Sequence, residues 1–503
     1  MIDHGEQARL KILVRDAQTS ILGPLSVHGW TATIVSSHPE DSGYLIIEAQ
    51  RASAKHRIAF LYTTAVGNAL YRRLESQVEV FLINGALDDV EQYAYGIKIP
   101  VLPSDDFFSI LLKWNEEVSP GKISVDSRDS KELRQKREYQ LIRSENPIQQ
   151  IWSQLNQIAS VQLAKTIVQE RGTHDQETIE SKAVGLAYAV RNASDYFRSS
   201  AGENISQRIL NRYYGTLSFA FAELLASPSG AKKLSEIEES TKHGHGLYTV
   251  DGEEEDFPNL TVGPLSRGFF PKWLNALGLD TSIYPSKKPS KASELSRLPP
   301  NMCVTLRDVF ARIPEVGDLF LDIFDTAHLW VTPVYDDDAN PSTFGKKQTD
   351  KTYAQFIDHS CRLDGTDIAK LKAPLSQIQF VKADSQGRHF RALVDVGDHK
   401  VWWDAIKPIH HSPFASATGA LILPLFGGIS EIRVIMLVLL YALSIIVRYR
   451  PSLWRRIQEA DWDQYKVLIH ATLDIIDRVL PQEFLQSITN RKIVAALPGS
   501  FFG

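Results

Sequence analysis

Residues 433–454, RVIMLVLLYALSIIVRYRPSLW, contain the apolar run that decides the fold class. Every residue of 434–447 is apolar except Ser444, and arginines bracket the run. As a helix, these fourteen residues extend for about 21 Å, less than the ~30 Å hydrocarbon core of a bilayer. A helix that is apolar on all sides, too short to span and followed by Pro451 is typical of the buried centre of a helical domain. Insertion in a membrane is the alternative, because the flanks are basic.

The composition is that of a globular protein with a sizeable core. The chain has 503 residues, enough for roughly two to four domains, with 43% hydrophobic and 23% charged residues. The net charge of −5 excludes a general basic field, so any contact with nucleic acid must use local patches. Two cysteines, Cys303 and Cys361, are too few for a disulfide framework, and the N-terminus lacks a signal pattern. We therefore expect a cytoplasmic protein with reduced thiols.

Residues 1–118 alternate between helical and strand patterns. We expect a helix at 7–22 and a crossover helix at 68–76. Four β-branched or aromatic runs are expected as strands: 30–36, 43–50, 57–63 and 78–83. Strand, helix and strand in succession predict an α/β domain with a mixed sheet.

Residues 119–147 have a different character. They begin with Ser-Pro-Gly and carry few apolar residues, which predicts a linker or an exposed helix. Their positive charges include Lys131, Arg134, Lys136 and Arg137, interleaved with glutamates. This basic segment is either a solvated surface or a nucleic-acid-binding patch.

The rest of the chain is predicted to be helical with a β-rich insertion. Residues 148–324 contain apolar residues at helical spacing in 148–170, 177–199 and 205–226. Residues 325–412 are expected to form strands and turns, with strands at 328–335, 378–383, 389–396 and 400–406. Residues 413–503 are helical again, up to a long amphipathic helix at 465–479. The predicted fold class is multidomain α+β.

Polar side chains cluster at one strand of the N-terminal domain. Asp41 precedes the strand that ends in Glu48-Ala49-Gln50, and alternation places Glu48 and Gln50 on the same face. Two carboxylates and a third polar group can hold Mg²⁺, which could activate water for phosphodiester cleavage. The alternative is the ordinary polar face of a half-exposed strand.

This domain resembles the restriction-endonuclease-like fold, whose motif is D…(D/E)-x-K. The resemblance rests on the element order and on Asp41, Glu48 and Gln50. It implies that Asp41 and Glu48 bind Mg²⁺ or Mn²⁺ and that Gln50 orients water. Gln50 lacks the ammonium of the motif's lysine, and Lys55 can replace it only if the chain folds back. A degenerate fold retained for binding is equally consistent with the residues.

The helical segments 187–197 and 206–226 resemble the helical hairpin of HEPN domains, and residues 150–480 as a whole are similar to the YaaC-like family. The resemblance rests on two marks, YYG-x-LS at 213–218 and LS-x-x-x-RY-x-P-x-x-W at 443–454. It implies a helical core with a β-containing insertion.

Ribonuclease activity is not expected of this helical domain. No histidine follows Arg191 or Arg448 at the spacing of catalytic HEPN domains. We expect these arginines, with Arg450, to pair with buried carboxylates or to bind phosphate. His243 and His245 are expected to be loop histidines rather than zinc ligands.

Together the two resemblances imply a nucleic-acid-directed protein, by family analogy. We expect a metal-dependent nuclease or a nuclease-derived module of a prokaryotic anti-phage or restriction-like system, with DNA favoured over RNA and no membrane association. The alternative is a non-catalytic scaffold that oligomerises or binds a protein partner.

Overall fold

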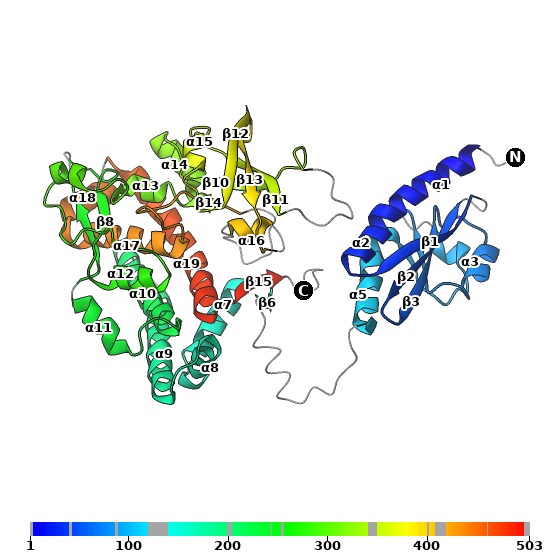
Figure 1. Cartoon of the computed structure of the whole chain (residues 1–503), viewed down its shortest axis with the longest axis horizontal. Helices are drawn as coiled ribbons and strands as arrows, with labels where there is room; N and C mark the ends of the chain where they lie inside the picture. Colours follow the sequence, from blue (N-terminus) through cyan, green and yellow to red (C-terminus); the bar gives the residue numbers. More distant parts are fainter. Residues whose placement is uncertain are drawn as a thin grey trace. The chain divides into compact units, whose positions relative to one another are not determined.

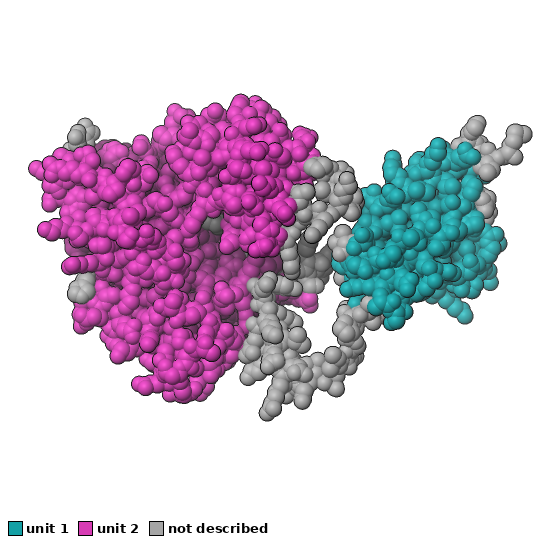
Figure 2. All heavy atoms as spheres, in the orientation of Figure 1, with its two compact units in different colours: residues 1–134 teal, residues 135–503 magenta. Residues whose placement is uncertain are grey.

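The computed structural model describes residues 4–39, 43–85, 89–118, 139–198, 204–242, 244–252, 256–340, 350–399, 402–407, 419–459 and 461–496. The chain divides into two compact units, residues 1–134 and residues 135–503 (Figure 2). Each unit is described by itself.

The N-terminal unit is a five-stranded mixed sheet with helices packed on both faces (Figure 1). Strands β1, β2 and β3 are antiparallel, and β4 and β5 continue the sheet parallel to β3. The strands are β1 (Thr31–His38), β2 (Tyr44–Arg51), β3 (Ala54–Leu61), β4 (Val80–Ile83) and β5 (Val101–Pro103). The helices are α1 (His4–Ala17), α2 (Gly23–Val27), α3 (Asn68–Leu74), α4 (Val90–Tyr93) and α5 (Phe107–Val118). The four predicted strands and the crossover helix are confirmed.

The two faces of the sheet have separate apolar cores. On β2, Leu45 and Ile47 pack in the core that includes α1 and α5. Tyr44 and Ile46 point to the other face and pack with α3. Because both faces are covered at this end, β2 begins as a continuous apolar run. Glu48 is the next residue of β2 on the face that packs with α3, and it is only partly buried. This face of the sheet is therefore polar where β2 ends.

The C-terminal unit is built around α17 (Ile432–Tyr449), which packs against α10, α13 and α19 (Figure 1). All side chains of residues 434–444 are buried, which confirms the predicted central helix. In the described part of the chain, α17 is the one helix long and apolar enough to cross a membrane, and 72% of it is buried inside the unit.

The other helices surround α17. They are α7 (Pro147–Ile158), α8 (Val161–Arg171), α9 (Gln176–Arg198), α10 (Ile205–Ala226), α11 (Leu234–Lys242), α12 (Phe269–Ala276), α13 (Leu306–Phe310), α14 (Gly317–Phe324), α18 (Pro451–Glu459) and α19 (Asp463–Thr489). The helix predicted at 148–170 is two helices, because Ser160 has extended backbone angles and precedes the first residue of α8.

A β-rich segment with its own apolar core lies within this unit. Its five-stranded antiparallel sheet has the order β12-β13-β11-β10-β14. The strands are β10 (Trp330–Tyr335), β11 (Lys351–Asp358), β12 (Leu375–Asp384), β13 (Gly387–Asp395) and β14 (Leu421–Ile422). A short helix, α15 (Gly365–Ile368), follows β11.

The strand predicted at 400–406 is wrong, because Trp402–Ile406 forms the helix α16. Both tryptophan rings are half-buried and pack against the core of the sheet. Periodicity does not distinguish strand from helix in so short an apolar run.

Two small sheets complete the unit. One consists of β7 (Leu247–Val250), β8 (Thr261–Pro264) and β9 (Val304–Thr305). In the other, β6 (Tyr139–Arg143) pairs in parallel with β15 (Lys492–Ala496). The last part of the predicted linker is therefore a strand of the C-terminal unit.

Candidate functional site

Three of the predicted site residues, Glu48, Gln50 and Lys55, lie together on the β2–β3 hairpin. In the antiparallel register, Glu48 lies opposite Arg57 and Gln50 lies opposite Lys55. Directly opposed residues share one face of a sheet, so the four side chains form one polar patch. The hairpin thus returns Lys55 to the strand that carries Glu48 and Gln50.

Glu48 is held by two cations. The Nζ atom of Lys55 lies 2.8 Å from one carboxylate oxygen of Glu48. The Nε and Nη2 atoms of Arg57 each lie 2.8 Å from the other oxygen. These hydrogen bonds, that from Lys55 first, lower the pKa of Glu48, so its carboxylate is ionised at neutral pH. Lys55, Arg57 and Glu48 together carry one excess positive charge.

The described residues do not form a complete divalent-metal site here. Mg²⁺ prefers several oxygen ligands, whereas both oxygens of Glu48 already accept bonds from cations. Within the described ranges, no three His, Cys, Asp or Glu side chains gather closely enough to hold a metal ion. Asp41, the other predicted ligand, lies outside the described residues, as do Lys131, Arg134, Lys136 and Arg137.

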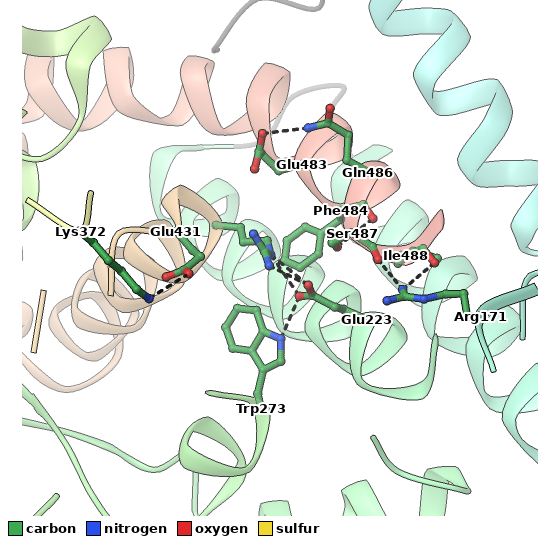
Figure 3. A network of polar contacts seen from close by, with 11 residues as sticks. Arg171, Glu223, Trp273, Lys372, Glu431, Glu483, Phe484, Gln486, Ser487 and Ile488 are labelled. Atoms are coloured by element: carbon green, nitrogen blue, oxygen red, sulfur yellow. Dashed lines mark hydrogen bonds and ion pairs between the residues drawn. The ribbon is translucent and has the colours of Figure 1, made fainter. Parts of the chain in front are cut away.

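A second polar site lies in the interior of the C-terminal unit, where Glu223 links three helices (Figure 3). Its carboxylate accepts bonds from Nε1 of Trp273 on α12 at 2.9 Å and from Nη2 of Arg433 on α17 at 2.8 Å. Nε of Arg433 lies 3.2 Å from both carboxylate oxygens, so the guanidinium and carboxylate planes meet edge to edge. The side chain of Glu223 is 5% exposed. The ion pair is therefore shielded from water.

A cavity of about 400 Å³ adjoins this ion pair, where the β-rich segment meets α17 and α19. Its lining includes Lys372, Lys407, Glu431, Arg433 and Glu483 together with apolar side chains. Nζ of Lys372 lies 3.9 Å from Glu431 and donates to a backbone carbonyl at 3.3 Å (Figure 3). Charges of both signs face the cavity, so its charge alone does not select a class of ligand.

The helices that carry the two sequence motifs, at 213–218 and 443–454, contact each other in the structure. Tyr213 on α10 packs against Tyr441 on α17, with ring centroids 6.1 Å apart. The hydroxyl of Tyr214 accepts a hydrogen bond from Nη1 of Arg448 at 3.3 Å. The central helix and the YYG helix therefore share one aromatic and cationic cluster.

His245 belongs to this cluster, whereas its sequence context predicted only a histidine in a loop. Its ring lies 5.7 Å from that of Tyr213 and 6.2 Å from that of Tyr441. Gly244 and Gly246 flank it, both with positive φ, a conformation that glycine adopts without strain. A histidine between two glycines was the available signal, but local sequence does not show which helices it faces.

The comparisons with known proteins bear on the C-terminal unit. A family model described as YaaC-like Protein matches residues 152–488, more than half of the chain. The match begins in α7 and ends in α19, so it contains the Glu223 ion pair and the His245 cluster. No curated protein and no solved structure matches the chain.

Proposed function

This chain belongs to the YaaC-like family, and we propose that it is a nucleic-acid-directed protein whose N-terminal unit is a nuclease-derived module. The order of α1, three antiparallel strands, α3 and a parallel β4 supports the proposal, because it is the order of the restriction-endonuclease-like fold. One observation carries the proposal: Nζ of Lys55 lies 2.8 Å from the Glu48 carboxylate. Gln50 lies opposite Lys55 on the same polar face of the hairpin.

The charges of this face favour phosphate binding over hydrolysis. Lys55 and Arg57 are both exposed, and both already hold an oxyanion, the carboxylate of Glu48. A phosphodiester group presents the same kind of acceptor, and arginine binds it with two parallel N–H groups. The excess positive charge of the cluster attracts a polyanion despite the net charge of −5.

A metal-dependent nuclease is the second candidate, and the position of Lys55 favours it. Its ammonium supplies, beside Glu48, the positive charge that Gln50 lacks. In that function Asp41 and Glu48 would hold Mg²⁺ or Mn²⁺, and the bound metal would supply an activated water and neutralise negative charge.

The proposal is tested by nucleic-acid binding to the full chain. Fluorescence anisotropy with labelled DNA and RNA is recorded at several salt concentrations in the presence of chelator. The double variant Lys55→Gln/Arg57→Gln is compared with Lys11→Gln/Lys98→Gln, which removes two exposed cations elsewhere in the unit. We expect the first variant alone to lose about two phosphate contacts with duplex DNA. The slope of log binding constant against log salt concentration should then become shallower by roughly 1.8. Equal affinity and equal salt dependence for both variants would refute the proposal.

The Glu48→Ala variant separates the two candidates. A phosphate-binding face keeps or gains affinity in this variant, because Lys55 and Arg57 lose their competing carboxylate. A nuclease instead shows cleavage with Mg²⁺ or Mn²⁺ that chelator and Glu48→Ala both abolish. If the chain neither binds nor cleaves nucleic acid but self-associates on size exclusion, the scaffold alternative is selected.

A further inference from the structure

Arg448 is a half-buried cation, and its hydrogen bonds to described residues all go to neutral groups. It donates from Nε to the carbonyl of Ser444 at 3.1 Å and from Nη2 to the hydroxyl of Ser444 at 3.1 Å. Its third bond, from Nη1, goes to the hydroxyl of Tyr214. Within the described ranges, Arg448 forms no ion pair with a carboxylate, whereas nearby Arg450 pairs with Asp251.

The position of Arg448 at the end of α17 explains only part of this arrangement. A cation in the last helical turn is stabilised by the helix dipole, and the bond to the Ser444 carbonyl is of this type. The guanidinium has five N–H groups in one plane, and three of them are used. Two donors remain for an acceptor that the described residues do not supply.

His245, in the same cluster, also has an atom whose hydrogen-bonding capacity is unused. Its Nδ1 atom is buried and has no hydrogen-bond partner within the described residues. Burial, and secondly the charge of Arg448, lower the pKa of His245, so the ring is neutral at pH 7. A neutral imidazole can still donate one hydrogen bond from Nδ1.

We propose that Arg448, Tyr214 and His245 form a binding site for a phosphoryl group. The Tyr214 hydroxyl accepts its bond from Arg448 and can donate its own proton to a ligand. All three groups therefore offer donors, and the guanidinium fork matches two oxygens of a phosphate. The positive charge of Arg448 and its unused N–H donors favour an oxyanion over a cation.

The site belongs to the C-terminal unit, whereas the proposed nucleic-acid face belongs to the N-terminal unit. Helices α10 and α17 lie side by side (Figure 1), and each carries one of the two sequence marks. Tyr449, which is 64% exposed, lies with its ring centroid 5.1 Å from the guanidinium carbon of Arg448. This aromatic surface beside the phosphate position suits a nucleoside base, so free phosphate and a nucleotide are both tested.

The experiment is calorimetric titration of the full chain with inorganic phosphate and, separately, with a mononucleotide. Arg448→Gln is compared with Arg455→Gln, an arginine 80% exposed in an ion pair within α18. We expect Arg448→Gln to weaken binding by about tenfold or more, since it removes charge-assisted hydrogen bonds, and Arg455→Gln to bind as the unmodified chain does. Tighter binding of the mononucleotide identifies a nucleotide site, and equal binding identifies free phosphate.

A second pair of variants keeps the test valid if Arg448→Gln does not fold. Tyr214→Phe removes one hydroxyl and keeps the ring, and Arg448→Lys keeps the charge without the fork. We expect both variants to show the melting temperature of the unmodified chain and weaker phosphate binding. The proposal is overturned if the unmodified chain shows no saturable binding up to about 10 mM. It is equally overturned if Arg448→Gln and Tyr214→Phe bind as tightly as the unmodified chain.

Discussion

The buried ion pair between Glu223 and Arg433 allows a quantitative test of how α10 and α17 are held together. The substitution Glu223→Gln keeps the size of the side chain and an acceptor for the N–H of Trp273, but removes the negative charge. Arg433, whose side chain is 15% exposed, then loses the carboxylate it is hydrogen-bonded to and keeps only the charges of Glu431 and Glu483 nearby. Removing one partner of a buried ion pair costs about 3–5 kcal/mol of unfolding free energy.

The expected change in melting temperature follows from the size of the unit. Residues 135–503 unfold with an entropy of about 2.1 cal/mol/K per residue, or roughly 0.8 kcal/mol/K for the unit. A loss of 3–5 kcal/mol therefore lowers the melting temperature of this unit by about 4–6 °C.

Differential scanning calorimetry of the full chain measures this shift. The matched control is Glu459→Gln, which breaks the exposed pair with Arg455. We expect the control to shift the transition by about 1 °C or less, because exposed ion pairs contribute ~0–1 kcal/mol. The double variant Glu223→Leu/Arg433→Leu should lose less than the sum of its single variants, since it leaves no buried charge unpaired.

Two results would refute this reasoning. One is a shift for Glu223→Gln no larger than that of Glu459→Gln. The other is strict additivity in the double variant, which would mean that the two side chains do not interact in the folded unit.

Three further predictions concern other buried groups. Burial lowers the pKa of Lys182 to about 8. Between about pH 8 and pH 10 the unfolded chain therefore binds more protons than the folded chain, so the free energy of unfolding should rise with pH in this window. The melting temperature should rise accordingly, and Lys182→Met should flatten that rise. Gly215→Ala should cost about 1–3 kcal/mol in urea unfolding, because its Cβ would lie 2.6 Å from the Phe197 ring, whereas Gly428→Ala, with open space around the new Cβ, is the control. Asp358→Asn should cost about 2–4 kcal/mol, because the fully buried carboxylate accepts three backbone N–H bonds and one hydroxyl bond that an amide cannot all accept; unchanged thermal stability would contradict this prediction.

Sequence alone determined the elements whose signal is local. The apolar run at 434–447 had to be buried because it has no polar side on which to meet water, and it is the centre of the C-terminal unit. The strands around Glu48 were predictable from their β-branched and aromatic runs, and the alternation of side chains along a strand put Gln50 on the face of Glu48. The strand prediction at 400–406 was wrong because the apolar run is too short to distinguish the period of a strand from that of a helix.

Only the tertiary structure decided which charged groups meet. Lys55 contacts Glu48 because the hairpin sets the register of β2 and β3. Glu223 pairs with Arg433, which lies 210 residues further along the chain. His245 lies beside Tyr213 and Tyr441 through the packing of a loop against two helices, which no spacing in the sequence encodes. Periodicity records which side of an element faces the core, whereas a site depends on the packing of several elements, and that follows from the fold as a whole.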